Sequence, residues 1–423
     1  MSYGLPGGLG TTMAPSLSLP FRYFVAGLAF LALFGLLIPF QGGLLLGGYF
    51  VPHLLALVHI VTLGWVVNTI IGATFQLVPV ALQVPIASER LGRWLFPLYL
   101  LAVVTLIVGF WLFDTRLLVL AGGLILLSGL MYLGNMACTL AQVKRWDPIA
   151  VHIAVSFGHL ALVGFLAVLL ILHNHFGLLG PAFLPTLKTH VLMAVVGFVS
   201  VLTMGVAYKL IPMFTLTEDL WSPRLGWAEL GLVHLGLAGL ILSFYAPQAA
   251  WLGWLGALAL LGGVGLFGWQ VVFLYAARRR RVFDVAMPFS LAGTAWFLLG
   301  VLIGSLVVVG LLPASVNLWK ALAYLLLVGW TGQMILGMMY KITTFLVWLN
   351  KYAARIGREP VPRLDDLYSR EMGMIGYGLW NAAVLTGGLV LGLGFAPLML
   401  AVALYLTGSV ILFLINMGLI ATR

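Results

Sequence analysis

Long apolar runs, separated by short segments rich in charge, proline and glycine, make up almost the whole chain. Twelve of these runs reach the roughly twenty residues that an α-helix needs to cross the hydrocarbon core of a bilayer. The pattern predicts an all-α integral membrane protein with twelve transmembrane helices, of which the second, sixth and tenth are the longest. The predicted spans cover residues 22–41, 51–82, 94–113, 117–141, 149–172, 187–214, 226–246, 251–276, 288–311, 318–347, 373–394 and 397–419.

The composition excludes the soluble classes of protein. Of the 423 residues, 63% are hydrophobic and 8% are charged, whereas roughly a quarter of the residues in a soluble domain are charged. Soluble enzymes and nucleic-acid binders are therefore excluded, and the lipid bilayer is the expected partner. The single cysteine, Cys138, allows no intramolecular disulfide and no Cys-x-x-Cys site, so any metal must be held by histidine.

The distribution of lysine and arginine predicts the orientation. Loops on one side of the membrane hold fourteen of these residues, and loops on the other side hold three. Cytoplasmic loops carry the excess, so we expect both termini in the cytoplasm and residues 1–21 as a short cytoplasmic tail. The arginine run at 278–281 is explained by this topology rule; binding to anionic lipid is the alternative.

An internal repeat relates the second, sixth and tenth predicted spans. In each span a glycine–aromatic pair precedes a second glycine by eight residues, and an aromatic–polar pair follows three residues later. The glycine–aromatic pairs recur after 133 and then 132 residues, as Gly64-Trp65, Gly197-Phe198 and Gly329-Trp330. Four spans in each copy give the copies the same orientation. The sequence therefore predicts one membrane domain, 1–423, built from three pseudo-threefold-related four-helix units at about 20–147, 148–287 and 288–423.

His59 begins the motif of the second span, which continues into Gly64-Trp65 and ends in Leu-Val-Pro at Pro79. With twelve spans in three four-helix arcs, this pattern resembles the catalytic subunit of the heme-copper oxidase superfamily, cytochrome c oxidase subunit I. The cbb-type oxidases, nitric oxide reductases and NnrS-like proteins are the most similar branches. The resemblance implies heme and copper held by histidines of the second, sixth, seventh and tenth spans. His59 then matches the second-span heme ligand, and His190 lies where a sixth-span copper ligand is expected.

The tenth span departs from this family. Leu322 and Tyr324 occupy the places of its two histidine ligands, and residues 318–324 contain no histidine. The seventh span and the loop after it contain no His-His pair. We therefore expect a divergent member without a complete heme-copper active site, and we do not expect it to reduce dioxygen to water.

His59 and His190 are the first choice for a heme site. They precede their glycine–aromatic pairs by five and seven residues, so their depths in the membrane differ by about 3 Å at the rise of an α-helix. Two histidines from different helices can ligate one heme from opposite faces. We expect this pair to hold the iron of a heme b. The alternative is that each ring bonds a neighbouring carbonyl.

His159 and His234 are the second choice, for a heme or a copper site. Both lie near mid-membrane, on the fifth and seventh spans, and His152 shares the face of His159 because it lies seven residues away. A polar contact in the bundle core is the alternative. In the other two units, Leu100 and Asn381 correspond to His234.

The other intramembrane or loop residues have simpler interpretations. His173 and His175 fit a solvated loop better than a copper or zinc site, and His53 lies near the outer interface. Glu229 lies inside a span, where a proton role and pairing with Arg224 are the two alternatives.

Lys209 and Lys341 occupy matched positions near the cytoplasmic ends of their spans. Snorkelling to the interface is the simple account, and a role in proton entry is the alternative. Residues 350–371 mix both signs of charge and are interpreted as a solvated connection, with partner docking as the alternative.

Three functions remain. The first is a heme-binding redox or gas-handling protein, concerned with nitric oxide or dioxygen, whose partner is a respiratory electron donor or an oxidase subunit; as an enzyme it would be a heme-dependent oxidoreductase. The second is a cofactor-free transporter, which the scarcity of polar residues in mid-span counts against. The third is a structural or assembly subunit. By resemblance, we expect the inner or plasma membrane of a prokaryote.

Overall fold

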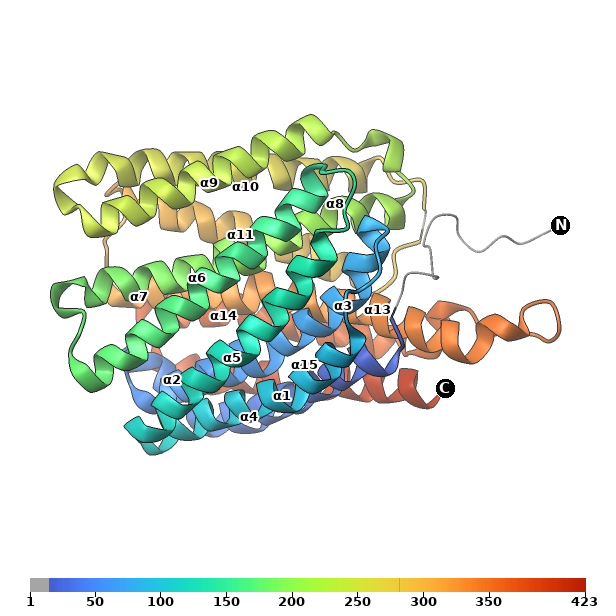
Figure 1. Cartoon of the computed structure of the whole chain (residues 1–423), viewed down its shortest axis with the longest axis horizontal. Coiled ribbons are helices and arrows are strands. Elements are labelled where there is room, and N and C mark those ends of the chain that lie inside the picture. The colour runs from blue at the N-terminus through green and yellow to red at the C-terminus, as the bar shows by residue number, and fades with distance from the viewer. Residues whose placement is uncertain (1–14, 281) are drawn as a thin grey trace.

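The computed structural model describes residues 15–280 and 282–423, which form helices and loops without any strand. Twelve of these helices are long and apolar enough to cross a membrane, as the sequence predicts. Figure 1 shows them side by side along the long axis of the molecule. The first helix, α1 (Ser18–Gln41), begins at the same end as the last, α15 (Met399–Thr422), finishes. We call this end the terminal end.

Most spans are single α-helices, whereas the second, sixth and tenth each contain a central π-helix. The single helices are α1, α4 (Glu89–Leu112), α5 (Thr115–Leu140), α6 (Pro148–Phe176), α9 (Pro223–Tyr245), α10 (Ala250–Ala276), α11 (Ala286–Val308), α14 (Arg370–Leu393) and α15. The three interrupted spans are α2 (Pro52–His59), η3 (Ile60–Val67) and α3 (Asn68–Leu82); α7 (Phe183–Leu192), η5 (Met193–Ser200) and α8 (Val201–Thr215); and α12 (Val316–Tyr324), η8 (Leu325–Gly332) and α13 (Gln333–Tyr352). Short 3-10 turns occur at Gly42–Leu46, Gly180–Ala182, Glu218–Leu220, Pro247–Ala249, Ala353–Arg355, Leu364–Leu367 and Ala396–Leu398.

Polar caps set several helix starts at the terminal end. Ser88 accepts a hydrogen bond from the N–H of Leu91 at the start of α4, and Asp147 accepts one from Ala150 at the start of α6. Such caps satisfy N–H groups that have no partner within the helix. The capped first turn of α4 contains charged residues that interrupt the apolar pattern. This is why α4 begins at Glu89, ahead of the predicted 94–113.

The three interrupted spans form the inside of the bundle. In their most apolar stretches 72%, 67% and 72% of residues are buried, against 50% or less in the other spans. The outer spans surround them. The helix pairs α4–α5, α9–α10 and α14–α15 pack together, α5 packs on α6, α10 on α11, and α15 returns to α1, which closes the ring.

Each π-helix contains the glycine–aromatic pair of the sequence repeat. The three segments begin at Ile60, Met193 and Leu325, in each case four residues before the glycine of the pair. A π-helix bonds residues i and i+5 instead of i and i+4, so each segment contains extra backbone within an otherwise regular span. Nothing in the apolar pattern predicts this local geometry.

A side chain from an outer span bonds a carbonyl oxygen in each π-helix. The hydroxyl of Tyr99 donates to Leu63 O at 2.9 Å, and the indole N–H of Trp380 donates to Val328 O at 2.9 Å. In the sixth span, Nδ1 of His159 lies 2.6 Å from Gly197 O. We call Tyr99, His159 and Trp380 the π anchors, because each holds one inner span to the ring.

A cavity of about 100 Å³ lies between the three inner spans, in α3, α8 and α13. Equivalent positions of the repeat line it, such as Thr69, Leu202 and Met334. The lining is apolar apart from threonines, and the hydroxyls of Thr69 and Thr203 are already bonded to carbonyls of their own helices. The cavity therefore provides no chain of polar groups along the axis.

Other buried polar side chains near the π-helices connect helices to one another. The indole N–H of Trp330 donates to Ser200 Oγ at 2.8 Å and so joins the tenth and sixth spans. Gln333 and Asn381 join the tenth and eleventh spans through two hydrogen bonds. The expectation that few polar residues lie in mid-span was therefore too simple, because the core contains them as paired contacts between helices.

Two sequence-based expectations need adjustment at the ends of the chain and of the spans. The predicted tail, 1–21, falls mostly outside the described residues, and α1 already begins at Ser18. The tenth span is longer than 318–347 and extends over Val316–Arg355, 40 residues. The periodic apolar pattern fades at its end because the last turns stand beyond the apolar part of the bundle.

Candidate functional site

His59 and His190 each lie just before the π-helix of their span. Nδ1 of His59 is 2.7 Å from Leu55 O, and Nδ1 of His190 is 3.2 Å from Val163 O. A carbonyl oxygen only accepts hydrogen bonds, so each Nδ1 carries the proton and each Nε2 keeps its lone pair. Both first-choice residues thus have the tautomer that a metal ligand requires.

Aromatic packing orients the ring of His59. Phe110 of α4 stacks on it, with ring centroids 5.0 Å apart and an angle of 29° between the planes. One face of the imidazole is therefore covered, and a ligand can approach Nε2 only along the ring edge. The ring edge is the direction in which imidazole binds a metal.

His159 and His234 are direct neighbours. Their ring centroids are 5.0 Å apart, with 32° between the planes. Nδ1 of His159 is engaged at Gly197 O, and Nδ1 of His234 lies 2.7 Å from Leu230 O. Both Nε2 atoms consequently keep lone pairs. Nε2 of His234 is buried and has no hydrogen-bond partner among the described residues.

The spacing of His159 and His234 distinguishes between the two ligands considered for them. A metal bound at about 2 Å from two opposed imidazole nitrogens sets the ring centres about 6 Å apart, and a tetrahedral angle at the metal reduces this separation to about 5 Å. The observed 5.0 Å suits the second geometry. The centroid separation alone is thus shorter than the roughly 6 Å that two opposed imidazole ligands on one iron require.

A fully buried histidine–carboxylate pair lies on the terminal side of these rings. Nε2 of His152 is 2.7 Å from Glu229 Oε2, and both side chains have no exposed surface. Nδ1 of His152 lies 2.6 Å from Pro148 O and carries a proton. A single further proton is therefore shared between His152 Nε2 and Glu229 Oε2, held as imidazolium and carboxylate or as imidazole and carboxylic acid.

Two more side chains extend this pair into a buried network. The hydroxyl of Tyr208 donates to Glu229 Oε2 at 3.1 Å, and Gln270 donates to the Tyr208 oxygen at 3.2 Å. The second carboxylate oxygen of Glu229, Oε1, is buried without a partner. Arg224 takes no part, so the alternative pairing of Glu229 with Arg224 is wrong. The network uses His152 instead, because α6 presents it to α9 inside the bundle.

Sequence reasoning named Glu229 and His152 separately but missed Tyr208 and Gln270 as their partners. Tyr208 could be identified from the sequence as the aromatic residue of the aromatic–polar pair in the sixth span. Gln270 could not be identified in this way, because it lies on the eighth span and the repeat was derived mainly from the second, sixth and tenth spans. Only the packing of α10 against α8 brings Gln270 to the tyrosine.

A different pair lies beside the tenth span from the histidine pair beside the sixth. The indole N–H of Trp296 donates to Asn381 Oδ1 at 2.9 Å. Trp296 packs beside Gly329, as His159 packs beside Gly197. The sequence alignment of His234 with Asn381 agrees with these contacts.

The remaining candidates lie outside these groups. The predicted loop is wrong for His173 and His175, because both lie in the last turn of α6. His173 stacks on Phe183 and accepts the N–H of Leu179, while His175 is exposed. His53 is exposed as well.

The two matched lysines have different surroundings. Lys209 is exposed, whereas Lys341 pairs with the buried carboxylate of Asp284 and lies over the ring of Phe214. Snorkelling is therefore the wrong account for Lys341, because a carboxylate from the loop between α10 and α11 reaches it first.

Within 15–280 and 282–423, no three histidine, cysteine or acidic side chains converge as a metal cage. Any metal would therefore depend on a histidine pair, completed by a cofactor or an exogenous ligand. No protein-family model matches the sequence, and no curated protein matches it either. The geometry of the histidines is therefore the basis for assigning a function.

Proposed function

We propose that the protein is a heme-binding membrane redox or gas-handling protein, a divergent relative of the heme-copper oxidase catalytic subunit. One observation carries the proposal: four buried or half-buried histidines each commit Nδ1–H to a backbone carbonyl and leave Nε2 free. Histidines that ligate metals take this form, because the bond from the other nitrogen fixes the tautomer and the ring orientation.

His59 and His190 would hold a heme b in this proposal. The heme would supply an iron that changes oxidation state or binds a diatomic gas such as nitric oxide. The protein's part is to orient the two rings through Leu55 O and Val163 O, to cover one face of His59 with Phe110 and to exclude water. His159 and His234 would hold copper, for which their separation is suited.

The His152–Glu229 pair gives the proposal a proton-holding group close to the second histidine pair. His152 lies seven residues before His159 on α6, two turns of one helix face. An electron that enters a low-dielectric site is stabilised by a proton taken up nearby. Glu229 can take or give that proton at Oε2 while Tyr208, which itself accepts from Gln270, keeps that oxygen hydrogen-bonded.

The proposed architecture is three four-helix units related by a pseudo-threefold axis along the membrane normal. It is supported by the three π-helices in repeat register, by the cavity lined with equivalent positions and by the closed ring of outer spans. We place both termini in the cytoplasm of a prokaryote, from the excess of lysine and arginine in the loops at the terminal end. A respiratory electron donor or oxidase subunit would dock at this end, where residues 350–371 lie.

Optical spectra test the heme site directly. We expect detergent-purified protein to show a b-type α-band on dithionite reduction and a positive pyridine hemochrome assay. His59→Ala and His190→Ala should each abolish at least nine tenths of this band, because one lost axial ligand no longer retains the heme. His175→Ala is the matched control and should leave the band unchanged, since His175 is exposed.

Three results would contradict parts of the proposal. A colourless and copper-free protein would remove the cofactor altogether and favour the transporter or assembly function. Loss of the band only in His159→Ala and His234→Ala would move the heme to the second pair. Copper that persists in those two variants would show that they do not bind it.

A further inference from the structure

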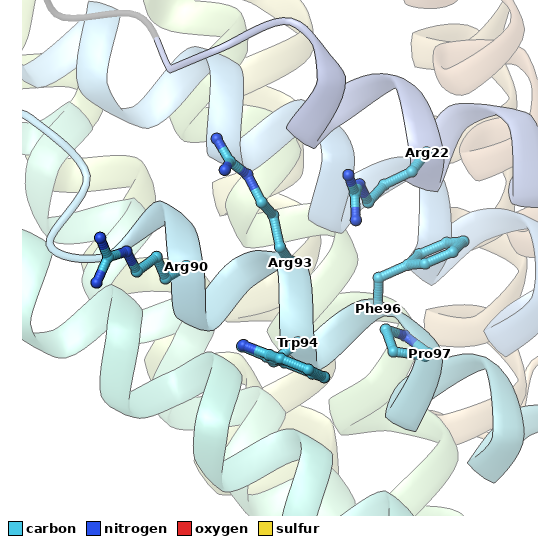
Figure 2. Close-up of a pocket in the computed structure, with 6 residues that line it drawn as sticks. All are labelled: Arg22, Arg90, Arg93, Trp94, Phe96 and Pro97. Carbon is cyan, nitrogen blue, oxygen red and sulfur yellow. The ribbon is translucent and has the colours of Figure 1, made fainter.

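A pocket with three arginines opens on the outside of the ring at the terminal end. Its volume is about 480 Å³, and it is lined by Arg22 of α1 together with Arg90, Arg93, Trp94, Phe96 and Pro97 of α4. Figure 2 shows Arg93 between Arg22 and Arg90, with the ring of Trp94 to one side. These residues belong to the first turns of their helices, where the apolar part of each span begins.

Only one of the three arginines has a carboxylate partner among the described residues. Arg93 donates to Glu89 Oε2 at 2.8 Å, and Ser16 donates to the same carboxylate. Arg22 bonds only the carbonyl of Ser18. Arg90 forms no ion pair among the described residues, and residues 1–14 contain no aspartate or glutamate that could neutralise it. The pocket therefore keeps an excess positive charge.

Several other arginines at this end have carboxylates of their own. Arg279 forms two hydrogen bonds to Asp219, at 2.9 and 2.7 Å. Arg355 pairs with Glu359. The pocket differs because three arginines line it around one carboxylate, so an anion bound there would gain the partners that the chain does not provide.

The surroundings favour a lipid over a soluble anion. The side chain of Trp94 is 72% exposed, on the outer surface of a span. Tryptophan at such a position marks the headgroup level of a bilayer, where its ring lies beside acyl chains and its N–H faces the polar layer. Arginine binds phosphate through paired hydrogen bonds at the same level. The ring of Phe96 adds a second apolar surface to the pocket, with its centroid 5.8 Å from Cζ of Arg22.

We propose that Arg22, Arg90 and Arg93 bind the phosphate of an acidic phospholipid, with Trp94 against its acyl or glycerol region. The chemical group that the site would recognise is a phosphate ester, which lipid headgroups and soluble metabolites both carry. The lipid is the source because the pocket joins a cationic rim to an apolar, lipid-facing wall.

The test is native mass spectrometry of the full-length protein in detergent, titrated with phosphatidylglycerol and, separately, with phosphatidylcholine. We expect the first phosphatidylglycerol to bind at least tenfold more weakly to the double variant Arg22→Gln/Arg90→Gln, because each arginine near the surface contributes roughly fivefold in affinity for an anionic lipid. Arg145→Gln/Arg224→Gln is the control. It removes two exposed arginines from the same end and should bind as the wild type does.

Folding is checked separately through Arg90→Lys, which keeps the charge and should retain most of the affinity. Equal binding of phosphatidylglycerol to the wild type and the double variant would overturn the site. Equal binding of phosphatidylcholine, whose phosphate is balanced by choline, would show that the site does not select a net negative headgroup and would overturn the acidic phospholipid as its occupant. Displacement of the lipid by millimolar inorganic phosphate would overturn the lipid as occupant in favour of a soluble phosphate ester.

Discussion

Replacing Glu229 by leucine is expected to lower the free energy of unfolding by about 3–5 kcal/mol, the cost of removing one partner from a buried ion pair. The leucine leaves His152 Nε2 without its hydrogen-bond partner and the Tyr208 hydroxyl without its acceptor, in a place that water does not reach. The measurement is the unfolding transition of purified protein in mixed micelles with increasing dodecyl sulfate. Glu371→Leu is the control, because this carboxylate is exposed at the start of α14.

The double variant His152→Leu/Glu229→Leu separates the pair from its individual members. It removes both polar groups together. Its decrease in the free energy of unfolding should therefore be smaller, by at least 1 kcal/mol, than the sum of the decreases in the two single variants. Additive losses would show that the two side chains do not interact. Glu229→Gln adds a further distinction: an amide can donate to neutral His152 Nε2, so a nearly unchanged stability would indicate that the shared proton normally lies on the carboxyl group.

Gly256→Val is expected to destabilise the protein by about 3 kcal/mol, at the upper end of the usual cost of overpacking. A β-carbon at Gly256 would lie 2.6 Å from Leu240 N and 2.9 Å from Gly236 O. These are backbone atoms of α9, which cannot move aside as a flexible side chain can. Small residues allow this close approach of two helices within the bilayer. The same unfolding titration measures the effect.

Gly265→Val is the matched control for this substitution. Gly265 lies on the same helix, α10, and a β-carbon there would meet nothing within 4 Å. Valine also has a slightly higher helix propensity than glycine, so the free energy of unfolding of Gly265→Val should stay within about 0.5 kcal/mol of the wild-type value. The free energy of unfolding of Gly256→Ala should lie between those of Gly256→Val and Gly265→Val. Similar losses at 256 and 265 would show that the α9–α10 contact is looser than described.

The number and approximate positions of the spans were predictable because hydrophobic length is a local property that the bilayer sets, whereas polar ends such as the first turn of α4 and the last turns of the tenth span were not. The repeat motif also located the three inner spans. The π-helices were not predictable, and they limit helical-wheel arguments. One extra residue in a turn rotates all later side chains by about 100°. Residues on either side of η3, such as His59 and Thr69, therefore do not share the faces that a continuous helix would give them.

The candidate site was predictable only in part, namely where residues of similar depth lie on neighbouring spans. His159 and His234 were expected to approach each other because they lie at similar depth on neighbouring spans, and their rings are in contact. The partner of Glu229 was not predicted. The nearest basic residue along the chain, Arg224, was considered, whereas the fold supplies His152 from a different helix. Sequence proximity is a poor guide where buried charges find partners across helices.

The π anchors have a consequence for motion in the bundle. A π-helix contains surplus length, which can travel along its span when i+5 bonds are exchanged for i+4 bonds one at a time. Such travel slides the backbone by a fraction of a turn without breaking the helix. Tyr99, His159 and Trp380 each fix the surplus at one carbonyl. Two of these anchors are ordinary structural donors, whereas the third is an imidazole beside His234. Any event that reorients the His159 ring would therefore remove this anchor from the sixth span alone, while the anchors of the second and tenth spans stay in place.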